Sequence, residues 1–524
     1  MKNHFEVKMA PDGFFQKLNR DTIKKEWKAS FLAAFCIGLV IHMPVLLADI
    51  PNHDGLSSMY FDQNMITSGR WFLMVACGFS SFYTIPWLIG ILGLTFLSFA
   101  AAAMTELLEV RRMWAAVLIG GLLVSFPALA STFAYVFTMD GYMLGLLLAV
   151  AAVLFAKKYR RGFVFGGICL AFSIGTYQAY LPFAMILSVY AVLMTAADAA
   201  DTKEKVKKIM RYLYMGVIGV SAYYVILQIL LKLQGKELDT YQGINGMASG
   251  AATGVFFSDF KEIYHDFFAF SLKGNVIFHN VPSLAACCVL VLLTLAALLC
   301  LVRDRKWWKN PVIFAIMILT LGMIPLITNV ILIISPGVTY HLLMRYQYVL
   351  FLIGMVAFIS GSNEGKRFSA GMEWVGLGAA FVLVFHYAVT DNIAYSNLEK
   401  RYEKTYAYCV RLLDRIEQTE GYYPGIPIAM IGRVSDEQYP DTDISLPVTS
   451  NMIGLYGDSL LYTADNYREF IRHYLGASLN IQPASAMEEI YYTEEYKAME
   501  SFPGESCIRI IDGVMYVKTE NFNR

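Results

Sequence analysis

The stretch ASFLAAFCIGLVIHMPVLL, residues 29–47, decides the class of fold. It contains no Asp, Glu, Lys or Arg, and it follows a charged leader, residues 1–28. A helix needs about 20 apolar residues to cross the hydrocarbon core of a bilayer, which this run supplies. The apolar core of a secretory signal is shorter, roughly 7–15 residues. We therefore expect the run to remain in the membrane as the first transmembrane helix.

The remainder of the chain has the same apolar character. Of its 524 residues, 57% are hydrophobic and only 16% are charged, whereas soluble domains carry about 25% charged residues. Residues 71–84 are apolar but too short to span, which indicates a re-entrant or interfacial helix. Eleven longer apolar runs predict eleven transmembrane helices, at 29–48, 85–107, 113–136, 141–156, 162–176, 179–197, 212–233, 281–302, 311–334, 346–362 and 370–390.

The distribution of cations orients this bundle. With the N-terminus in the cytoplasm, the inner segments hold 24 Lys and Arg and the outer connections hold five. Cytoplasmic loops of membrane proteins are enriched in Lys and Arg in this way. Residues 51–71 are then the first outer loop, and the region after the eleventh span lies outside the cytoplasmic membrane.

The chain divides into a cytoplasmic segment (1–28), a transmembrane domain (29–390) and a C-terminal domain (391–524). The last holds 12 Lys and Arg against 21 Asp and Glu. Its pattern predicts a strand near 426–434, a helix over 463–475, and a hairpin turning at Asp512-Gly513. Cys409 and Cys507 either pair or stay reduced, because spacing alone does not show proximity. The predicted fold is mainly α, a polytopic helix bundle with an extracytoplasmic α/β domain.

The first outer loop carries candidate catalytic residues. Asp54 follows a polar turn and can cap a helix over 55–68, or it can act as a general base. Its grouping with His53 and Arg70 in one short loop favours the base. Arg70, beside Trp71, either binds a phosphate through two hydrogen bonds or anchors the loop at the membrane interface.

Three other outer connections carry polar residues. Asp140 lies in a tight turn at membrane depth, where acids are often functional, although a capping role fits equally well. Tyr177 and Gln178 can hydrogen-bond sugar hydroxyls, or they are ordinary turn residues. Arg345 can bind a lipid phosphate, or its charged end can reach the interface while its stem stays in lipid.

The stretch NHDGLSSMYFDQNMITSGRWF, residues 52–72, resembles the first outer loop of the glucosyl transferase II family. These are polytopic enzymes related to the O-antigen serotype-converting glucosyltransferases. Asp54 matches the second acid of the family's paired acidic motif, Gly69-Arg70 match its Gly-Arg, and His53 stands in place of the first acid. FTMDGYMLGLLLA (137–149) and GTYQAYLPFA (175–184) resemble two further family segments.

The resemblance implies a GT-C type fold and an inverting transfer of a hexose, by this likeness glucose, from a polyprenyl-phosphate carrier to a cell-surface glycan. Asp54 and Asp140 are the catalytic candidates. The candidates for binding the substrate and the donor phosphate are Arg70, Arg345, Tyr177, Gln178 and His53. The partners implied are the lipid-linked donor, a glycan acceptor and the bilayer, with no cofactor, metal or nucleic acid.

The alternative is a transporter or flippase of lipid-linked sugars. Transporters place their binding residues near the bilayer midplane. The candidates in this chain lie at outer helix ends instead, which favours an enzyme. A phosphate-binding loop motif is absent from the sequence, so coupling to ATP is not expected.

Overall fold

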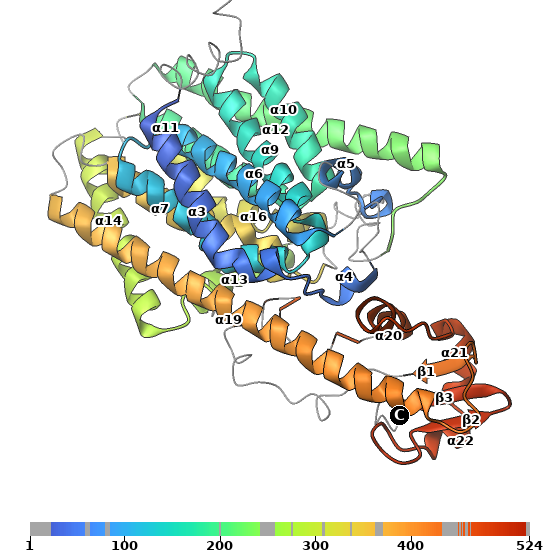
Figure 1. The fold of residues 1–524 in the computed structure, drawn as a ribbon. Coiled ribbons are helices and arrows are strands. Elements are labelled where there is room, and N and C mark those ends of the chain that lie inside the picture. The colour runs from blue at the N-terminus through green and yellow to red at the C-terminus, as the bar shows by residue number, and fades with distance from the viewer. Residues whose placement is uncertain are drawn as a thin grey trace, which may run out of the picture.

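The computed structural model describes residues 23–57, 63–78, 84–198, 201–240, 257–273, 276–305, 310–335, 338–361 and 370–431, and then 449, 452, 454–455, 460–461 and 463–519. Within these ranges the regular structure is almost all helical, with three short strands near the C-terminus (Figure 1). The fold class predicted from the sequence, a mainly α polytopic bundle, is confirmed.

Eight helices in the described part are long and apolar enough to cross a membrane. A ninth span forms if α7 (Met113–Ser125) and α8 (Pro127–Phe133) are taken together across their 48° bend. The eight are α3 (Lys25–Leu47), α6 (Pro86–Leu107), α9 (Met139–Lys158, extended by the 3-10 turn η3, Val136–Thr138), α11 (Tyr180–Ala197), α12 (Thr202–Gln234), α14 (Val281–Arg305), α18 (Val349–Gly361, extended by the 3-10 segment η7, Leu342–Tyr348) and α19 (Ala370–Glu417).

The two remaining expected spans are helical but short. Helix α10 (Gly162–Thr176) has 15 residues and α15 (Pro311–Gly322) has 12. Helix α15 gives way to α16 (Ile324–Thr328) and α17 (Val330–Ile334), because Pro325 lacks a backbone donor and Asn329 leaves the helical conformation. Positions of apolar segments are therefore easier to read from the sequence than their continuity.

Close helix contacts hold the bundle together. Helix α3 packs against α6 and α7, and α9 packs against α6 and α10. At the crossing of α3 and α7, a Cβ on Gly120 would lie 2.6 Å from the Ser30 carbonyl oxygen. Small residues allow backbones to approach in this way, which suits helices packed in lipid, where the hydrophobic effect between helices is weak.

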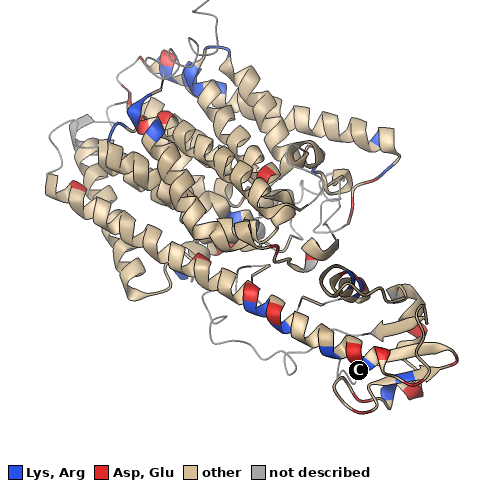
Figure 2. Ribbon diagram, in the orientation of Figure 1, with Lys and Arg blue, Asp and Glu red and all other residues tan. Residues whose placement is uncertain are grey.

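Charged residues gather at one end of the bundle. Ion pairs there join Lys24 Nζ to Glu106 Oε2 at 2.6 Å and Lys157 Nζ to Glu109 Oε1 at 2.8 Å. Figure 2 shows this charged end opposite the C-terminal domain, with a mostly uncharged ribbon between them. We call the end that bears the C-terminal domain the outer end, following the orientation expected from the sequence.

The outer end is built from short elements. The first outer loop contains α4 (His53–Ser57) and the 3-10 turn η2 (Ile66–Ser68), and α5 (Leu73–Cys77) follows it within the apolar segment 71–84. A continuous helix over 55–68 was expected and is wrong, since Gln63 has a left-handed φ of 55° and precedes a separate turn. The segment from Ser258 has the apolar and polar pattern of an amphipathic helix, and it lies in α13 (Phe257–Lys273).

Helix α19 joins the bundle to the C-terminal domain. It has 48 residues, about twice the number needed to cross a bilayer. Its second half leaves the bundle and carries alternating charges (Figures 1 and 2). The boundary expected at residue 391 falls inside this helix, so the two regions share one continuous element.

The C-terminal domain has a three-stranded sheet in the order β1-β3-β2. Strand β1 (Ile428–Ile431) is parallel to β3 (Val514–Lys518), and β2 (Ile508–Ile511) is antiparallel to β3. The predicted turn at Asp512-Gly513 is confirmed, with φ of 50° and 79°, as a two-residue hairpin requires. The domain also contains helices α20 (Ala464–Phe470), α21 (Ala484–Tyr491) and α22 (Glu494–Lys497), and the π-helical turn η9 (Ile471–Leu475).

The domain's core is continuous with the first outer loop. Leu56 of α4 is 1% exposed and belongs to the same apolar cluster as Tyr467 and Phe470 of α20. Cys409 and Cys507 lie in this cluster too, and they are not joined by a disulfide. The domain therefore packs directly on the loop that holds Asp54 (Figure 1).

Candidate active site

The Gly69-Arg70 turn is fastened to the outer turn between α10 and α11. The Arg70 backbone N–H donates to the Met65 carbonyl over 3.0 Å, and the Phe72 N–H donates to the Gly175 carbonyl over 2.8 Å. Gly69 has a left-handed φ of 75°. A Cβ on it would collide with the Gln178 amide nitrogen and lie 2.7 Å from the Tyr223 hydroxyl. Only glycine fits, which accounts physically for the Gly in this motif.

Gln178 holds the turn in place. Its Nε2 donates to the Ser68 carbonyl over 2.8 Å and to the Tyr223 hydroxyl over 3.3 Å, and that hydroxyl donates to the Gly69 carbonyl over 3.1 Å. The amide donors of Gln178 are therefore engaged with the protein. The contact with a sugar suggested from the sequence stays a prediction, and the observed role is positioning.

Arg70 lies against two aromatic rings. Its Nη1 donates to the Tyr142 hydroxyl over 3.2 Å, and its guanidinium carbon lies 5.1 Å from the centre of the Tyr177 ring. The two rings stack on each other, with centres 4.9 Å apart. Burial raises the pKa of the Tyr177 hydroxyl and Arg70 acts against that rise, so the phenol stays neutral. Contacts with two aromatic side chains therefore restrict where the planar guanidinium of Arg70 lies.

Asp54 lies in the first turn of α4 and is exposed. The helix is capped by Asn52 instead, whose Oδ1 accepts from the Gly55 N–H over 2.7 Å. The capping role considered for Asp54 is therefore wrong. The carboxylate interacts electrostatically with Tyr142, the same phenol that receives the Arg70 hydrogen bond. Asp54 and Arg70 therefore share Tyr142 as a neighbour, and the catalytic role of Asp54 stays a prediction. The His53 side chain lies outside the described residues.

Asp140 is fully buried in the first turn of α9. Its Oδ1 accepts from the Gly141 N–H over 2.8 Å, and its carboxyl also interacts with the Cys77 thiol of α5. These contacts join α5 to α9 beneath the Arg70 turn. A catalytic role for Asp140 stays a prediction, whereas a role in shaping the site follows from its contacts.

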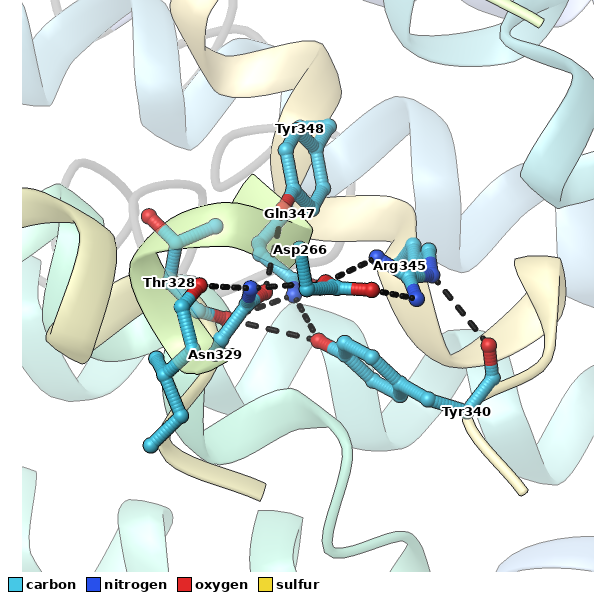
Figure 3. Close-up of polar contacts among 8 residues, drawn as sticks. Asp266, Thr328, Asn329, Tyr340, Arg345, Gln347 and Tyr348 are labelled. Atoms are coloured by element: carbon cyan, nitrogen blue, oxygen red, sulfur yellow. Dashed lines mark hydrogen bonds and ion pairs between the residues drawn. The ribbon is translucent and has the colours of Figure 1, made fainter. Parts of the chain in front are cut away.

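Arg345 is engaged by an acid that the sequence reasoning missed. Its Nη1 and Nη2 meet the two carboxylate oxygens of Asp266, on α13, at 2.7 and 2.8 Å. Figure 3 shows the guanidinium facing this carboxylate, with the Tyr340 ring alongside. The guanidinium carbon is 4.0 Å from the centre of that ring. Binding of a donor phosphate by Arg345 stays a prediction. Three of its five N–H groups already have protein partners, because two donate to Asp266 and Nε donates to the Tyr340 carbonyl over 3.2 Å.

A polar network surrounds this pair (Figure 3). Asn329 Nδ2 donates to Asp266 Oδ2 over 2.9 Å, and the Tyr348 hydroxyl donates to Asn329 Oδ1 over 3.0 Å. Gln347 Nε2 donates to the Tyr340 hydroxyl over 2.7 Å. Tyr340 in turn interacts electrostatically with Tyr177, so the Arg345 and Arg70 clusters are neighbours. The missed signal was an acid within the aromatic stretch YHDFF of the amphipathic helix.

Among the residues that the structure describes, no group of three or more His, Cys, Asp or Glu side chains could hold a metal ion. The acid expected beside Asp54 in the resembling family is His53 in this chain, and its side chain is not among those described.

The described part of the chain has several helices long and apolar enough to cross a membrane, which indicates a multi-pass membrane protein. The chain belongs to the glucosyl transferase GtrII family, whose model matches residues 43–359. That match spans the four outer segments that carry Asp54, Arg70, Asp140, Gln178 and Arg345. The comparison with curated proteins found no match, and neither did the comparison with solved structures.

Proposed function

We propose that this glucosyltransferase moves a hexose, glucose by its family, from a polyprenyl-phosphate carrier to a cell-surface glycan. The reaction takes place at the outer face of the cytoplasmic membrane, with the N-terminus inside. The observation that carries the proposal is the Arg70 guanidinium, fixed by the Gly69 turn against Tyr142 and Tyr177, next to the loop that presents Asp54.

The donor phosphate is assigned to Arg70. A phosphate at the end of a lipid chain has to be bound where the bilayer ends, and this guanidinium lies at the outer ends of α9 and α10. Its guanidinium carbon lies 5.1 Å from the centre of the Tyr177 ring, and a planar guanidinium can bind two phosphate oxygens through parallel hydrogen bonds. Tyr142 is fixed by the same contact and can donate its hydroxyl to the anion.

We assign removal of the proton from the acceptor hydroxyl to Asp54. The acceptor hydroxyl gives its proton to the Asp54 carboxylate as its oxygen attacks the anomeric carbon. The bond from that carbon to the phosphate oxygen breaks on the opposite face, and its electron pair remains on the phosphate. Arg70 stabilises the charge that develops there. One displacement of this kind inverts the configuration at the anomeric carbon.

Arg345 takes a supporting part. Its pair with Asp266 fixes α13 to η7, and the Tyr340 ring packs against the guanidinium of Arg345. In this assignment Arg70 binds the donor phosphate, and Arg345 holds α13 in place near the site.

The test supplies purified full-length protein, in lipid vesicles, with polyprenyl phosphates that carry radiolabelled glucose, galactose or mannose. Polysaccharide extracted from the surface of the producing cells serves as acceptor, and a labelled sugar nucleotide serves as control donor. We expect label on the polysaccharide from the lipid-linked glucose and none from the nucleotide. Passage of labelled lipid across the vesicle without transfer to glycan would instead establish the transporter.

A further inference from the structure

Acidic, histidine and tyrosine side chains meet at the junction between the first outer loop and the C-terminal domain, whereas the cores of the bundle and of the domain are apolar. We define the junction cluster as Asp49, Tyr402, Tyr406, Glu469, His473 and Tyr474. Asp49 follows α3, the two tyrosines at 402 and 406 lie one turn apart on the projecting half of α19, and the other three lie on α20 and the turn η9. Three chain segments distant in sequence therefore meet here.

Aromatic rings form one side of the cluster. The Tyr402 ring centre is 5.3 Å from that of Tyr474 and 6.3 Å from that of Tyr406. Phe470 lies behind them, 5.0 Å from Tyr474, and is fully buried in the domain core. Tyr402 and Tyr474 are half-buried, and Tyr406 is 42% exposed. The tyrosine rings therefore pack against the domain core on one side and are exposed to solvent on the other.

Acidic and imidazole groups form the other side. The Tyr474 hydroxyl donates to Asp49 Oδ2 over 3.5 Å, and His473 Nε2 lies 3.2 Å from Glu469 Oε2. Asp49 keeps an open surface, yet the groups crowded around it withdraw enough water to raise the pKa of its carboxyl. His473 and Tyr474 lie in a π-helical turn, a local conformation that is rare and frequent at functional sites.

This combination matches the chemistry of a sugar ring. A pyranose presents an apolar face of C–H groups, which packs on tyrosine rings, and a rim of hydroxyls, which donate to carboxylates and accept from phenols and imidazole. An interior contact between domains would bury its rings and its carboxylates, whereas Tyr406 and Asp49 remain open. The position also fits, because Asp49 precedes Asp54 by five residues and Leu56 seats the same loop against α20.

Resting on the proposed function, we propose that the junction cluster is a subsite for a hydroxyl-rich sugar unit of the acceptor glycan, which holds the polymer while one of its hydroxyls reaches Asp54. The C-terminal domain then supplies acceptor binding, and the transmembrane domain supplies donor binding and the reaction.

The experiment measures transfer and acceptor binding for Tyr406→Ala, Asp49→Asn and the matched control Tyr423→Ala. Tyr423 is also an exposed tyrosine of the C-terminal domain, at 54%, and lies outside the cluster. The surface polysaccharide of the producing cells is the probe. We expect each cluster variant to raise the acceptor KM about tenfold. The donor KM and the slow release of sugar to water without acceptor should not change, and the control should match wild type.

Binding of the same polysaccharide to the purified protein without donor separates the two proposals. If the wild type binds the polysaccharide through Tyr406 and Asp49 but cleaves no lipid-linked donor, the subsite stands and the proposed reaction fails. If the wild type transfers sugar while both cluster variants keep the wild-type acceptor KM and affinity, the subsite is overturned. A loss in kcat alone, with acceptor affinity unchanged, overturns it as well, since that result describes a structural contact.

Discussion

Asp266 of α13 and Arg345 of η7 form a two-point ion pair that fixes the outer amphipathic helix to the membrane bundle, with N–O distances of 2.7 and 2.8 Å. The pair unites segments 79 residues apart. The apolar face of an amphipathic helix can hold it at a membrane surface. Here a charge pair and the stacking of Phe267 on Tyr348, with ring centres 5.8 Å apart, also determine where it lies.

Replacement of Asp266 by Asn should leave Arg345 without its counter-charge. The Arg345 side chain is only 10% exposed and that of Asp266 is 33% exposed, so the free energy of unfolding should fall by about 2 kcal/mol, between the values for surface and buried pairs. Thermal unfolding in detergent measures the loss. Glu262→Gln, at an exposed acid of the same helix, is the control and should stay within about 0.5 kcal/mol of wild type.

The double variant Asp266→Asn with Arg345→Met extends this test. Removing both charges leaves no buried charge without a partner, so the double variant should be more stable than Asp266→Asn alone. If the free energies of unfolding lost in the two single variants add up to the loss in the double variant, the ion pair is not what holds α13.

Gly69→Ala should disable the Arg70 turn. The new Cβ meets the Gln178 amide and the Tyr223 hydroxyl, and the left-handed backbone adds strain of about 1 kcal/mol. Gly235→Ala is a matched control, because Gly235 also has a positive φ, 61°, but has nothing within 4 Å of its Cβ position. We expect a donor KM at least about tenfold higher for Gly69→Ala and near wild type for Gly235→Ala. Equal kinetics for the two variants would mean that the collision does not matter.

Leu56→Ala should loosen the first outer loop from the C-terminal domain. The side chain is 1% exposed within the domain's core, and truncation of such a leucine costs about 2–5 kcal/mol. Limited proteolysis should cut the junction faster, and kcat should fall with donor KM unchanged. Leu56→Met keeps most of the volume and should restore both properties. Failure of the methionine variant to do so would point to a requirement other than packing.

Asp49 should make stability depend on pH. Partial burial raises the pKa of its carboxyl above the ordinary 3.8, so the folded protein holds this proton more tightly than the unfolded chain. Stability from this group is therefore greatest below pH 3.8 and falls as the pH rises through the raised pKa. Between pH 3.8 and higher pH, the midpoint temperature of thermal unfolding should fall less for Asp49→Asn than for wild type. Superimposable profiles would contradict the raised pKa.

The sequence predicted best those features that depend on neighbouring residues in the chain. Apolar runs mark the helices because lipid demands them, and the Asp512-Gly513 turn is set by backbone conformations that few residues adopt. Arg70, Tyr177 and Gln178 were found because short outer turns with polar residues are unusual. Their proximity in space depends on how the helices pack. The sequence indicated only that all three residues lie in outer segments.

Other features could not be read from the sequence. Asp266 looked like the polar face of a surface helix, since its partner is distant in the chain. Asn52 and Asp54 are both good capping residues, and only the start of α4 at His53 decides between them. The shared helix α19 was divided at residue 391 because its composition changes there, while its backbone does not. Leu56 is one apolar residue in a polar loop until the C-terminal domain is folded against it.

Asp54→Asn tests the central claim most directly. The amide keeps the size of the side chain but does not accept the proton, and Asn52 caps the helix, so α4 should still form. Glu237→Gln is the control, at an exposed acid after α12. With labelled polyprenyl-phosphate glucose and surface polysaccharide, we expect kcat to fall about 10²–10⁴-fold for Asp54→Asn, with both KM values retained, and to stay at wild type for Glu237→Gln. Transfer by Asp54→Asn at the wild-type rate would contradict the account.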